Sequence, residues 1–255
     1  MMQRVLHIRS DNITEIVHSD KCFHIDDVTD FGSVSAVTVS FDSFAVFGEL
    51  VYQLIIKTSV KRFVQNYMYR NLNYLNTQEQ NIIYNEICME IDKDKCIGNI
   101  SVIAASRSVL STEGIFNFLL NWIHPELEEL CIIKAGELSA RNEYLDFIRM
   151  LRFFADINYG NEDTVHVVMK SSDTADVYDN LFNIINDEDN YDTEISCLNE
   201  FVGYDSLISV LVETSPKEII LHNANKFDTS DICETLTNIF DERVMFCTGC
   251  SFCND

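Results

Sequence analysis

Residues that break helices are scarce in this sequence. Its 255 residues include only two prolines and eight glycines, so long and little-interrupted helices are expected. Apolar runs of the length needed to span a membrane, about 18 residues without a charge, are also missing, which excludes a membrane-spanning helix. Near the N-terminus, Arg9, Asp11 and Glu15 interrupt the apolar core that a signal peptide needs. We therefore expect a cytoplasmic protein.

Basic residues are also scarce. The chain has 18 lysines and arginines against 41 acidic residues, a formal net charge of −23. Residues 156–255 hold 21 acidic and 4 basic residues, so −17 of that charge falls in the last 100 residues. A surface with this charge repels phosphate backbones, which excludes non-specific binding of nucleic acid. A basic protein partner remains compatible with it.

The motifs that mark common enzymes are absent too. The sequence contains no phosphate loop of the form G-x-x-x-x-G-K-[ST], no G-x-G-x-x-G, no G-x-S-x-G and no H-E-x-x-H. Acidic residues are so frequent that their spacing says nothing about acid–base catalysis. No catalytic residue is assigned on this basis, and whether the protein is an enzyme stays open.

What the sequence does contain indicates a mixed α and β fold. Residues 34–47 (VSAVTVSFDSFAVF) are rich in Val, Phe, Ser and Thr, which predicts two short strands, or one strand with a bend at Asp42 and Ser43. Helical periodicity then predicts three helices: 49–71, 77–91 and 100–110. Thr77 and Gln80 fit a capping box at the start of the second helix.

The central part is the most strongly periodic. It predicts three consecutive helical runs: 111–122, 126–135 and 142–157. Pro125 lies where a helix tolerates proline, in its first turn, and Gly136 separates the last two runs. Arg149 and Arg152 flank the apolar stripe of the last run, and we expect them to pair with nearby acidic residues.

The last part alternates strands and helices. TVHVVMK (164–170) and TADVYDNLF (174–182) predict a β-hairpin, and the acidic stretch 186–194 predicts a solvated loop. After a short helix at 205–213 come a strand, a helix and a second strand: 218–222, 230–240 and 243–247. This succession predicts a βαβ unit with a right-handed crossover and parallel strands.

These patterns together predict an α+β or α/β chain. Its N-terminal and central parts are helix-rich with a short β element, and its C-terminal α/β part contains a β-hairpin and a parallel βαβ unit that ends in a cysteine-rich tail. The matching domain prediction has three parts: 1–110, 111–160 and 161–255.

Three cysteines close the sequence, in FCTGCSFCND, at the spacing C-x2-C-x2-C. Cysteines three positions apart form a chelating turn, which is why this spacing recurs in zinc and iron–sulfur sites. Gly249 permits a tight turn between the first two. Cys247, Cys250 and Cys253 are therefore predicted metal ligands, with zinc or an iron–sulfur cluster as the cofactor.

Three thiolates leave a tetrahedral zinc ion one ligand short, and a ferredoxin-type run would need a further cysteine followed by proline. His222 is the preferred fourth ligand, because the parallel strands of a βαβ unit end at the same edge of the sheet. Other candidates are His166 on the hairpin, a carboxylate of Asp255, and a residue of a partner protein. An open fourth position would instead indicate catalysis.

Other interpretations of the cysteine and histidine residues stay open. The tail could hold free thiols, or Cys247 and Cys250 could form a redox dithiol, although such pairs usually open a helix and none is expected there. His18, Cys22 and His24 are zinc-type donors, but chance groupings are common among 15 Cys and His residues. The cysteines expected to be small core residues are Cys88, Cys131 and Cys233.

Five segments of the second half occur in the order and at the spacing of a known family. They are TEGIFNFLLNWI (112–123), EYLDFIRMLRFFADI (143–157), VHVVMK (165–170), LISVLVETSPKEIILHNA (207–224) and TLTNIFDERVMFCTGCSFC (235–253). Between about residue 100 and residue 255, the chain thereby resembles the YtxC-like sporulation proteins of endospore-forming bacteria.

The resemblance implies a cytoplasmic, sporulation-associated protein and implies no enzymatic activity. It also makes the cysteine-rich end a feature shared with the family. The function predicted first is a non-enzymatic protein whose metal-bound tail fixes the last strand or docks a protein partner. The alternative is a metal- or iron–sulfur-dependent enzyme, or a thiol redox protein, that uses the same tail.

Overall fold

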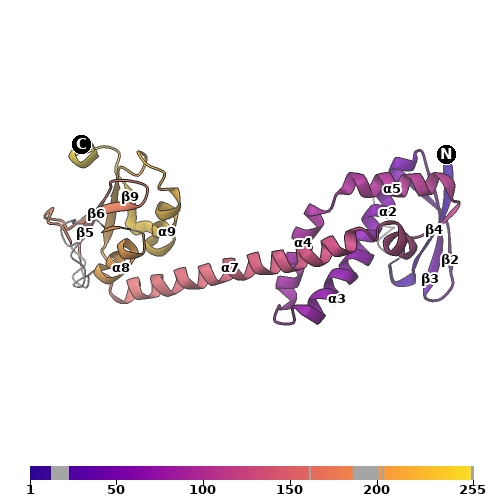
Figure 1. Cartoon of the computed structure of the whole chain (residues 1–255), viewed down its shortest axis with the longest axis horizontal. Helices are drawn as coiled ribbons and strands as arrows, with labels where there is room; N and C mark the ends of the chain where they lie inside the picture. Colours follow the sequence, from indigo (N-terminus) through magenta and orange to yellow (C-terminus); the bar gives the residue numbers. More distant parts are fainter. Residues whose placement is uncertain (13–22, 161, 186–200, 203, 254–255) are drawn as a thin grey trace. The chain divides into compact units, whose positions relative to one another are not determined.

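The computed structural model describes five stretches of the chain: 1–12, 23–160, 162–185, 201–202 and 204–253 (Figure 1). The chain divides into two compact units, Met1–Ala140 and Arg141–Asp255, and each unit has its own hydrophobic core. The fold is α+β. None of the helices in the described stretches combines the length and apolarity needed to cross a membrane. The three-part domain division stays a prediction, and the predicted loop at 186–194 lies outside the described residues.

A four-stranded sheet forms the β element of the first unit, with the order β2-β3-β1-β4. Its strands are β1 (Met2–Arg9), β2 (Phe23–Asp30), β3 (Val34–Phe41) and β4 (Val109–Ser111). β3 lies between β2 and β1 and is antiparallel to both, whereas β4 is parallel to β1. Of these four strands only β3 was predicted from the sequence, so the β element is larger than expected.

Strand β3 ends at Phe41 and the chain turns directly into a helix, so the prediction of a second strand up to Phe47 is wrong. Helix α2 spans Phe44–Ile55. Ser43 begins it, because the Ser43 side chain accepts a hydrogen bond from the N–H of Val46 at 3.3 Å. The rings of Phe41 and Phe47 pack with centroids 4.7 Å apart, so these apolar side chains join the strand to the helix.

Four further helical segments follow α2: η2 (Ile56–Val60, a π-helix), α3 (Lys61–Asn71), α4 (Thr77–Glu90) and α5 (Lys93–Ser106). The helix predicted at 100–110 has the wrong bounds. Its true start is fixed by Asp92, whose carboxylate accepts from the N–H of Lys95 at 3.0 Å. The segment after α5 forms strand β4 beside β1 instead of continuing the helix.

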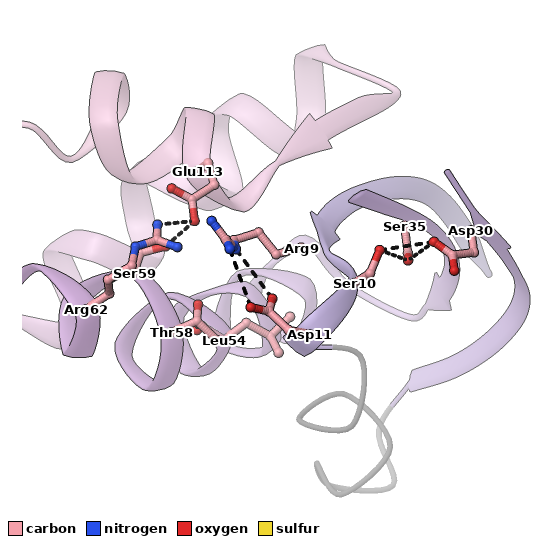
Figure 2. A network of polar contacts seen from close by, with 10 residues as sticks. All are labelled: Arg9, Ser10, Asp11, Asp30, Ser35, Leu54, Thr58, Ser59, Arg62 and Glu113. Carbon is pink, nitrogen blue, oxygen red and sulfur yellow. Dashed lines mark hydrogen bonds and ion pairs between the residues drawn. The ribbon is translucent and has the colours of Figure 1, made fainter. Parts of the chain in front are cut away.

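A polar cluster joins α3 and the π-helix η2 to α6 (Thr112–Gly114), the short helix that precedes a second π-helix, η3 (Ile115–Leu119). Glu113 accepts hydrogen bonds from Arg62 at 2.5 Å and from the buried Ser59 at 3.4 Å (Figure 2). These bonds connect segments more than 50 positions apart. In the structure, the helix predicted at 111–122 is divided into α6 and η3.

The capping box of α4 lies one residue earlier than predicted. Asn76, not Thr77, is the N-cap: its side chain accepts from the N–H groups of Gln78 at 2.9 Å and Glu79 at 3.1 Å. Glu79 in turn accepts from the N–H of Asn76 at 2.8 Å. The box is therefore made by residues 76 and 79, not by residues 77 and 80.

Replacing Asn76 with alanine is expected to lower the free energy of unfolding of the first unit by about 1 kcal/mol, because the cap hydrogen bonds are lost. Thr77→Ala is the matched control and is expected to change it by less than about 0.5 kcal/mol. Urea unfolding followed by the fluorescence of Trp122, the single tryptophan, measures both. Equal losses in the two variants would contradict the assignment of the cap.

Helix α7 spans Ile123–Ile157, 35 residues, and passes through Gly136 without interruption. The predicted break at Gly136 is therefore wrong. Glycine at an exposed helix position costs only about 1 kcal/mol relative to alanine, and packing of the helix offsets that cost. The residues of α7 in the core of the first unit are Ile123, Leu127, Cys131, Ala135 and Leu138. Pro125 lies in the first turn, where its missing N–H leaves no hydrogen bond unmade.

A five-stranded sheet organises the second unit, with the order β7-β6-β5-β8-β9. Its strands are β5 (Thr164–Met169), β6 (Thr174–Tyr178), β7 (Phe201–Val202), β8 (Glu218–His222) and β9 (Val244–Phe246). Two helices complete it: α8 (Tyr204–Thr214) and α9 (Ser230–Phe240). β5 and β6 form the predicted antiparallel hairpin, and β8, α9 and β9 form the predicted parallel βαβ unit.

The two faces of this sheet differ in chemistry. One face carries Val165, Val167, Ile219 and Leu221, which pack with α8, α9 and the end of α7 into the core of the unit. Side chains alternate along a strand, so their neighbours point to the opposite face. The strand pairing aligns Val168 of β5 with Asp176 of β6 and with His222 of β8. His166 lies two residues before Val168 on the same strand, so its side chain points to the same face. The face away from the helices therefore carries the histidines.

Candidate metal centre

Four predicted ligands come together at the edge of the second sheet. One donor atom from each of His222, Cys247, Cys250 and Cys253 lies within 4.8 Å of the donors of the others. His222 is buried, with 3% of its surface exposed, and the three cysteines are partly exposed. The structure thus brings together the residues that the cysteine spacing and the βαβ topology predicted.

The pairing of β8 and β9 explains why the histidine and the first cysteine meet. His222 is the last residue of β8, and the parallel pairing continues one residue past β9, where the N–H of Cys247 donates to the carbonyl of Leu221 at 2.9 Å. Both residues leave the sheet at the same edge, as parallel strands joined by a crossover must. Topology therefore brings the ligands to one edge although 25 positions of sequence separate them.

The tail then turns back so that the other two cysteines face His222. Gly249 adopts a φ of 137°, which only glycine reaches without strain, and Ser251–Cys253 form a short 3-10 helix. The Sγ atoms of Cys250 and Cys253 lie 3.2 Å and 3.7 Å from Nδ1 of His222, and 3.9 Å from each other.

These three separations lie within about 0.4 Å of those of ligands around one tetrahedral ion. With Zn–S bonds near 2.3 Å and Zn–N bonds near 2.0–2.1 Å, a tetrahedron places two sulfurs about 3.8 Å apart and a nitrogen and a sulfur about 3.6 Å apart. In a four-iron cluster each cysteine binds a different iron and the ligands lie farther apart, whereas in a two-iron cluster two ligands share one iron. The three cysteines and His222 therefore lie close enough together to hold a metal ion.

His166, the alternative histidine, contacts the candidate ligand instead of joining the cluster. Its Nδ1 lies 3.0 Å from Nε2 of His222, the ring nitrogen that faces away from the cysteines. Burial lowers the pKa of both imidazoles, and the neighbouring His166 lowers that of His222 further. Both rings are thereby kept in the neutral form, and a neutral imidazole is the form that binds metals. The other alternative, Asp255, lies outside the described residues.

Backbone N–H groups donate hydrogen bonds to two of the thiols, and each of these bonds favours a lower pKa. The N–H of Gly249 points to Sγ of Cys247 at 3.4 Å and lowers the pKa of that thiol, but burial and the two neighbouring cysteines outweigh it and the pKa is raised. Burial opposes ionisation of Cys253 as well, yet hydrogen bonds from the backbone of Asn223 and Cys250 and from the neighbouring thiols lower its pKa. The surroundings of the cluster therefore shift the pKa values of these two thiols in opposite directions.

The remaining cysteines of the described residues are not part of the cluster. Burial raises the pKa of Cys131 to about 12 and that of Cys96 to about 11, which makes both thiols unreactive near neutral pH. Cys233 is a partly buried residue packed against the core of the second unit. His18 and Cys22, the zinc-type donors grouped with His24 in the sequence, lie outside the described residues.

Two features beside the cluster are not evident from the sequence. One is the contact between His166 and His222, which follows only from the register of β5 with β8. The other is a cleft of about 130 Å³ beside Cys247 and Cys253, lined also by Lys226 and Phe246. The cleft is smaller than the pockets of about 300 Å³ and more that hold drug-sized ligands.

Fold and cluster together define a two-unit α+β protein in which three cysteines and one histidine lie close enough to hold a metal ion. A model of the YtxC-like family matches residues 46–245. Because this match covers well over half of the 255 residues, the chain belongs to the YtxC-like family. The match includes His222 and ends before Cys247.

The family match begins further upstream than the resemblance noted in the sequence, which starts near residue 100. It includes most of the helical part of the first unit and all the strands of the second unit except the end of β9. No curated protein and no solved structure matches the chain.

Proposed function

We propose that the protein binds one zinc ion through Cys247, Cys250, Cys253 and His222, and that the ion fixes the C-terminal tail to the sheet of the second unit. The observation that carries this proposal is the approach of all four donor atoms to within 4.8 Å of one another. Thiolates and neutral imidazole are the donors that zinc prefers.

The proposed role is structural because four protein ligands complete a tetrahedral site. A catalytic zinc ion keeps one position for water or substrate, and this donor set leaves none. The ion would cross-link the end of the last strand and the tail. The alternative role, in which an iron–sulfur cluster or a redox dithiol uses the same cysteines, is an outcome of the experiment below.

Membership of the YtxC-like family motivates the wider part of the proposal. We propose a cytoplasmic protein that acts in sporulation through a protein partner and not as an enzyme. The acidic C-terminal half supports a basic partner, because a strongly negative surface raises the association rate of a positive one.

Metal analysis of the full-length protein, purified without oxygen, tests the proposal. We expect one equivalent of zinc and a colourless sample. Replacement of zinc by Co²⁺ is expected to give the visible bands of a tetrahedral thiolate site, together with sulfur-to-metal charge transfer. A brown sample that contains iron and sulfide would show that the cysteines bind an iron–sulfur cluster and not zinc. Metal-free protein with three titratable tail thiols would contradict any metal site.

Replacing His166 with phenylalanine is expected to weaken zinc binding by about 10- to 100-fold, the usual effect of losing the hydrogen-bond partner of a ligating histidine. His166→Asn retains an acceptor for Nε2–H of His222 and is expected to recover part of the loss. Competition with a chromophoric chelator measures both affinities. The control is His7→Ala, at a partly exposed histidine of strand β1 in the first unit. An unchanged zinc affinity in His166→Phe would show that the contact between His166 and His222 does not contribute to zinc binding.

A further inference from the structure

The end of α7, within the second unit, is apolar on two faces. One face carries Ile148 and Ala155, which are buried in the core of the unit. The other face is exposed to solvent. We call it the α7 stripe, and its residues are Phe147, Met150, Phe153, Phe154 and Ile157. Each of the five is between 46% and 63% exposed. A contiguous exposed apolar patch rimmed by polar residues is typical of a contact surface.

The spacing of the stripe suits a second helix. Phe147, Met150, Phe154 and Ile157 follow one another at intervals of three, four and three residues, which is the spacing of a coiled-coil seam. The rings of Phe153 and Phe154 lie edge to face, with centroids 6.0 Å apart, and so form a broad aromatic ridge. Ridges of this kind pack into the groove between the side chains of a partner helix.

The negative charge of the second unit favours a basic partner helix over an acidic one. Residues 141–255 contain 23 acidic and 7 basic residues, a formal charge of −16. The arginines nearest the stripe are already engaged: Arg149 with Asp146 at 2.6 Å, and Arg152 with the carbonyl of Asn238 at 2.6 Å. Two copies of so acidic a unit repel each other, whereas a basic helix is attracted to it.

We propose that the α7 stripe is a docking site for an amphipathic helix with basic flanks, supplied by a partner protein. The apolar face of that helix would cover the aromatic ridge, and its lysines or arginines would face the acidic surface of the unit. The site is formed by α7 alone and does not depend on the metal centre.

A synthetic helical peptide tests this proposal with the full-length protein. The probe is a fluorescent peptide of leucine and lysine with leucines at positions i, i+3, i+4 and i+7, and its binding is followed by fluorescence anisotropy. Two further peptides serve as controls: one with the same composition in scrambled order, and one with glutamate in place of lysine. We expect binding of the periodic basic peptide, with at least about tenfold weaker binding of each control.

Two double variants locate the binding surface. Met150→Ser/Phe154→Ser removes two residues of the stripe. Met89→Ser/Phe118→Ser removes the same residue types from exposed positions of the first unit, 84% and 81% exposed. We expect the first variant to lose at least about tenfold in affinity for the periodic peptide and the second to bind as the parent does, because only the stripe supplies the apolar contact.

Three results would overturn the proposal. The stripe variant could bind the periodic peptide as tightly as the parent, which would reduce the interaction to charge alone. The scrambled peptide could bind as tightly as the periodic one, which would also reduce the interaction to charge alone. Light scattering could instead reveal a dimer of the parent protein that the stripe variant abolishes, which would assign the stripe to a second copy of the chain.

Discussion

Replacement of His222 with alanine is expected to weaken zinc binding by more than about a hundredfold. Structural zinc sites of four ligands bind with about 10–16 kcal/mol, so one ligand accounts for roughly 3 kcal/mol. Each 1.4 kcal/mol is tenfold in affinity. Competition with a chromophoric chelator, on protein loaded with one equivalent of zinc, measures the loss. Cys233→Ala is the control, because Cys233 lies in the same unit but not in the cluster.

A second variant separates loss of the ligand from loss of the fold. His222 is buried, so alanine also leaves a cavity that destabilises the unit. Cys253→Ser keeps the size of a partly exposed side chain and removes only a thiolate. We expect the same order of loss in both variants. Parent-like affinity in both, with the fold intact by circular dichroism, would exclude these two residues as ligands.

The candidate site could be predicted because its signals are local or topological. The spacing of the three cysteines is read directly from ten residues of sequence. The place of His222 follows from the βαβ rule, which brings the ends of β8 and β9 to one edge whatever the details of packing. The role of His166 could not be predicted, because it depends on the register of β5 against β8. A shift of one residue would turn His166 to the opposite face of the sheet.

The first unit shows where sequence patterns were insufficient. Strand β2 is an edge strand whose side chains are mostly exposed, and five of its eight residues are polar or charged, so it lacks the apolar alternation that identifies a half-buried strand. The 44–47 segment has strand-like composition, but the cap at Ser43 makes it helical. A cap that uses one hydrogen bond outweighed the weak strand preference of four residues.

Helix α7 illustrates the limit of glycine and proline as boundaries. Gly136 was expected to end a helix, but no left-handed turn or strand contact forms there, and a Cβ at that position would meet no other atom. A boundary needs a C-terminal cap in addition to a residue of low helix propensity. The apolar residues on either side of Gly136 keep a helical period and so continue the helix.

Replacement of Phe47 with alanine is expected to lower the free energy of unfolding of the first unit by about 3–5 kcal/mol. Phe47 is fully buried against Phe41, so its removal leaves a cavity as well as less buried apolar surface. Phe118→Ala is the matched control in the same unit: Phe118 is 81% exposed, and a change below about 0.5 kcal/mol is expected.

Unfolding of the two units can be followed separately in the Phe47→Ala variant. Trp122 is the single tryptophan and packs against the core of the first unit, so its fluorescence follows the unfolding of that unit in urea. Zinc release, followed with a chromophoric chelator, reports the second unit. Because the two cores share no residue, we expect Phe47→Ala to shift the fluorescence midpoint and to leave the midpoint of zinc release unchanged. A common shift of both midpoints would show that the units unfold as one cooperative structure, and would contradict the independence of the metal centre from the first core.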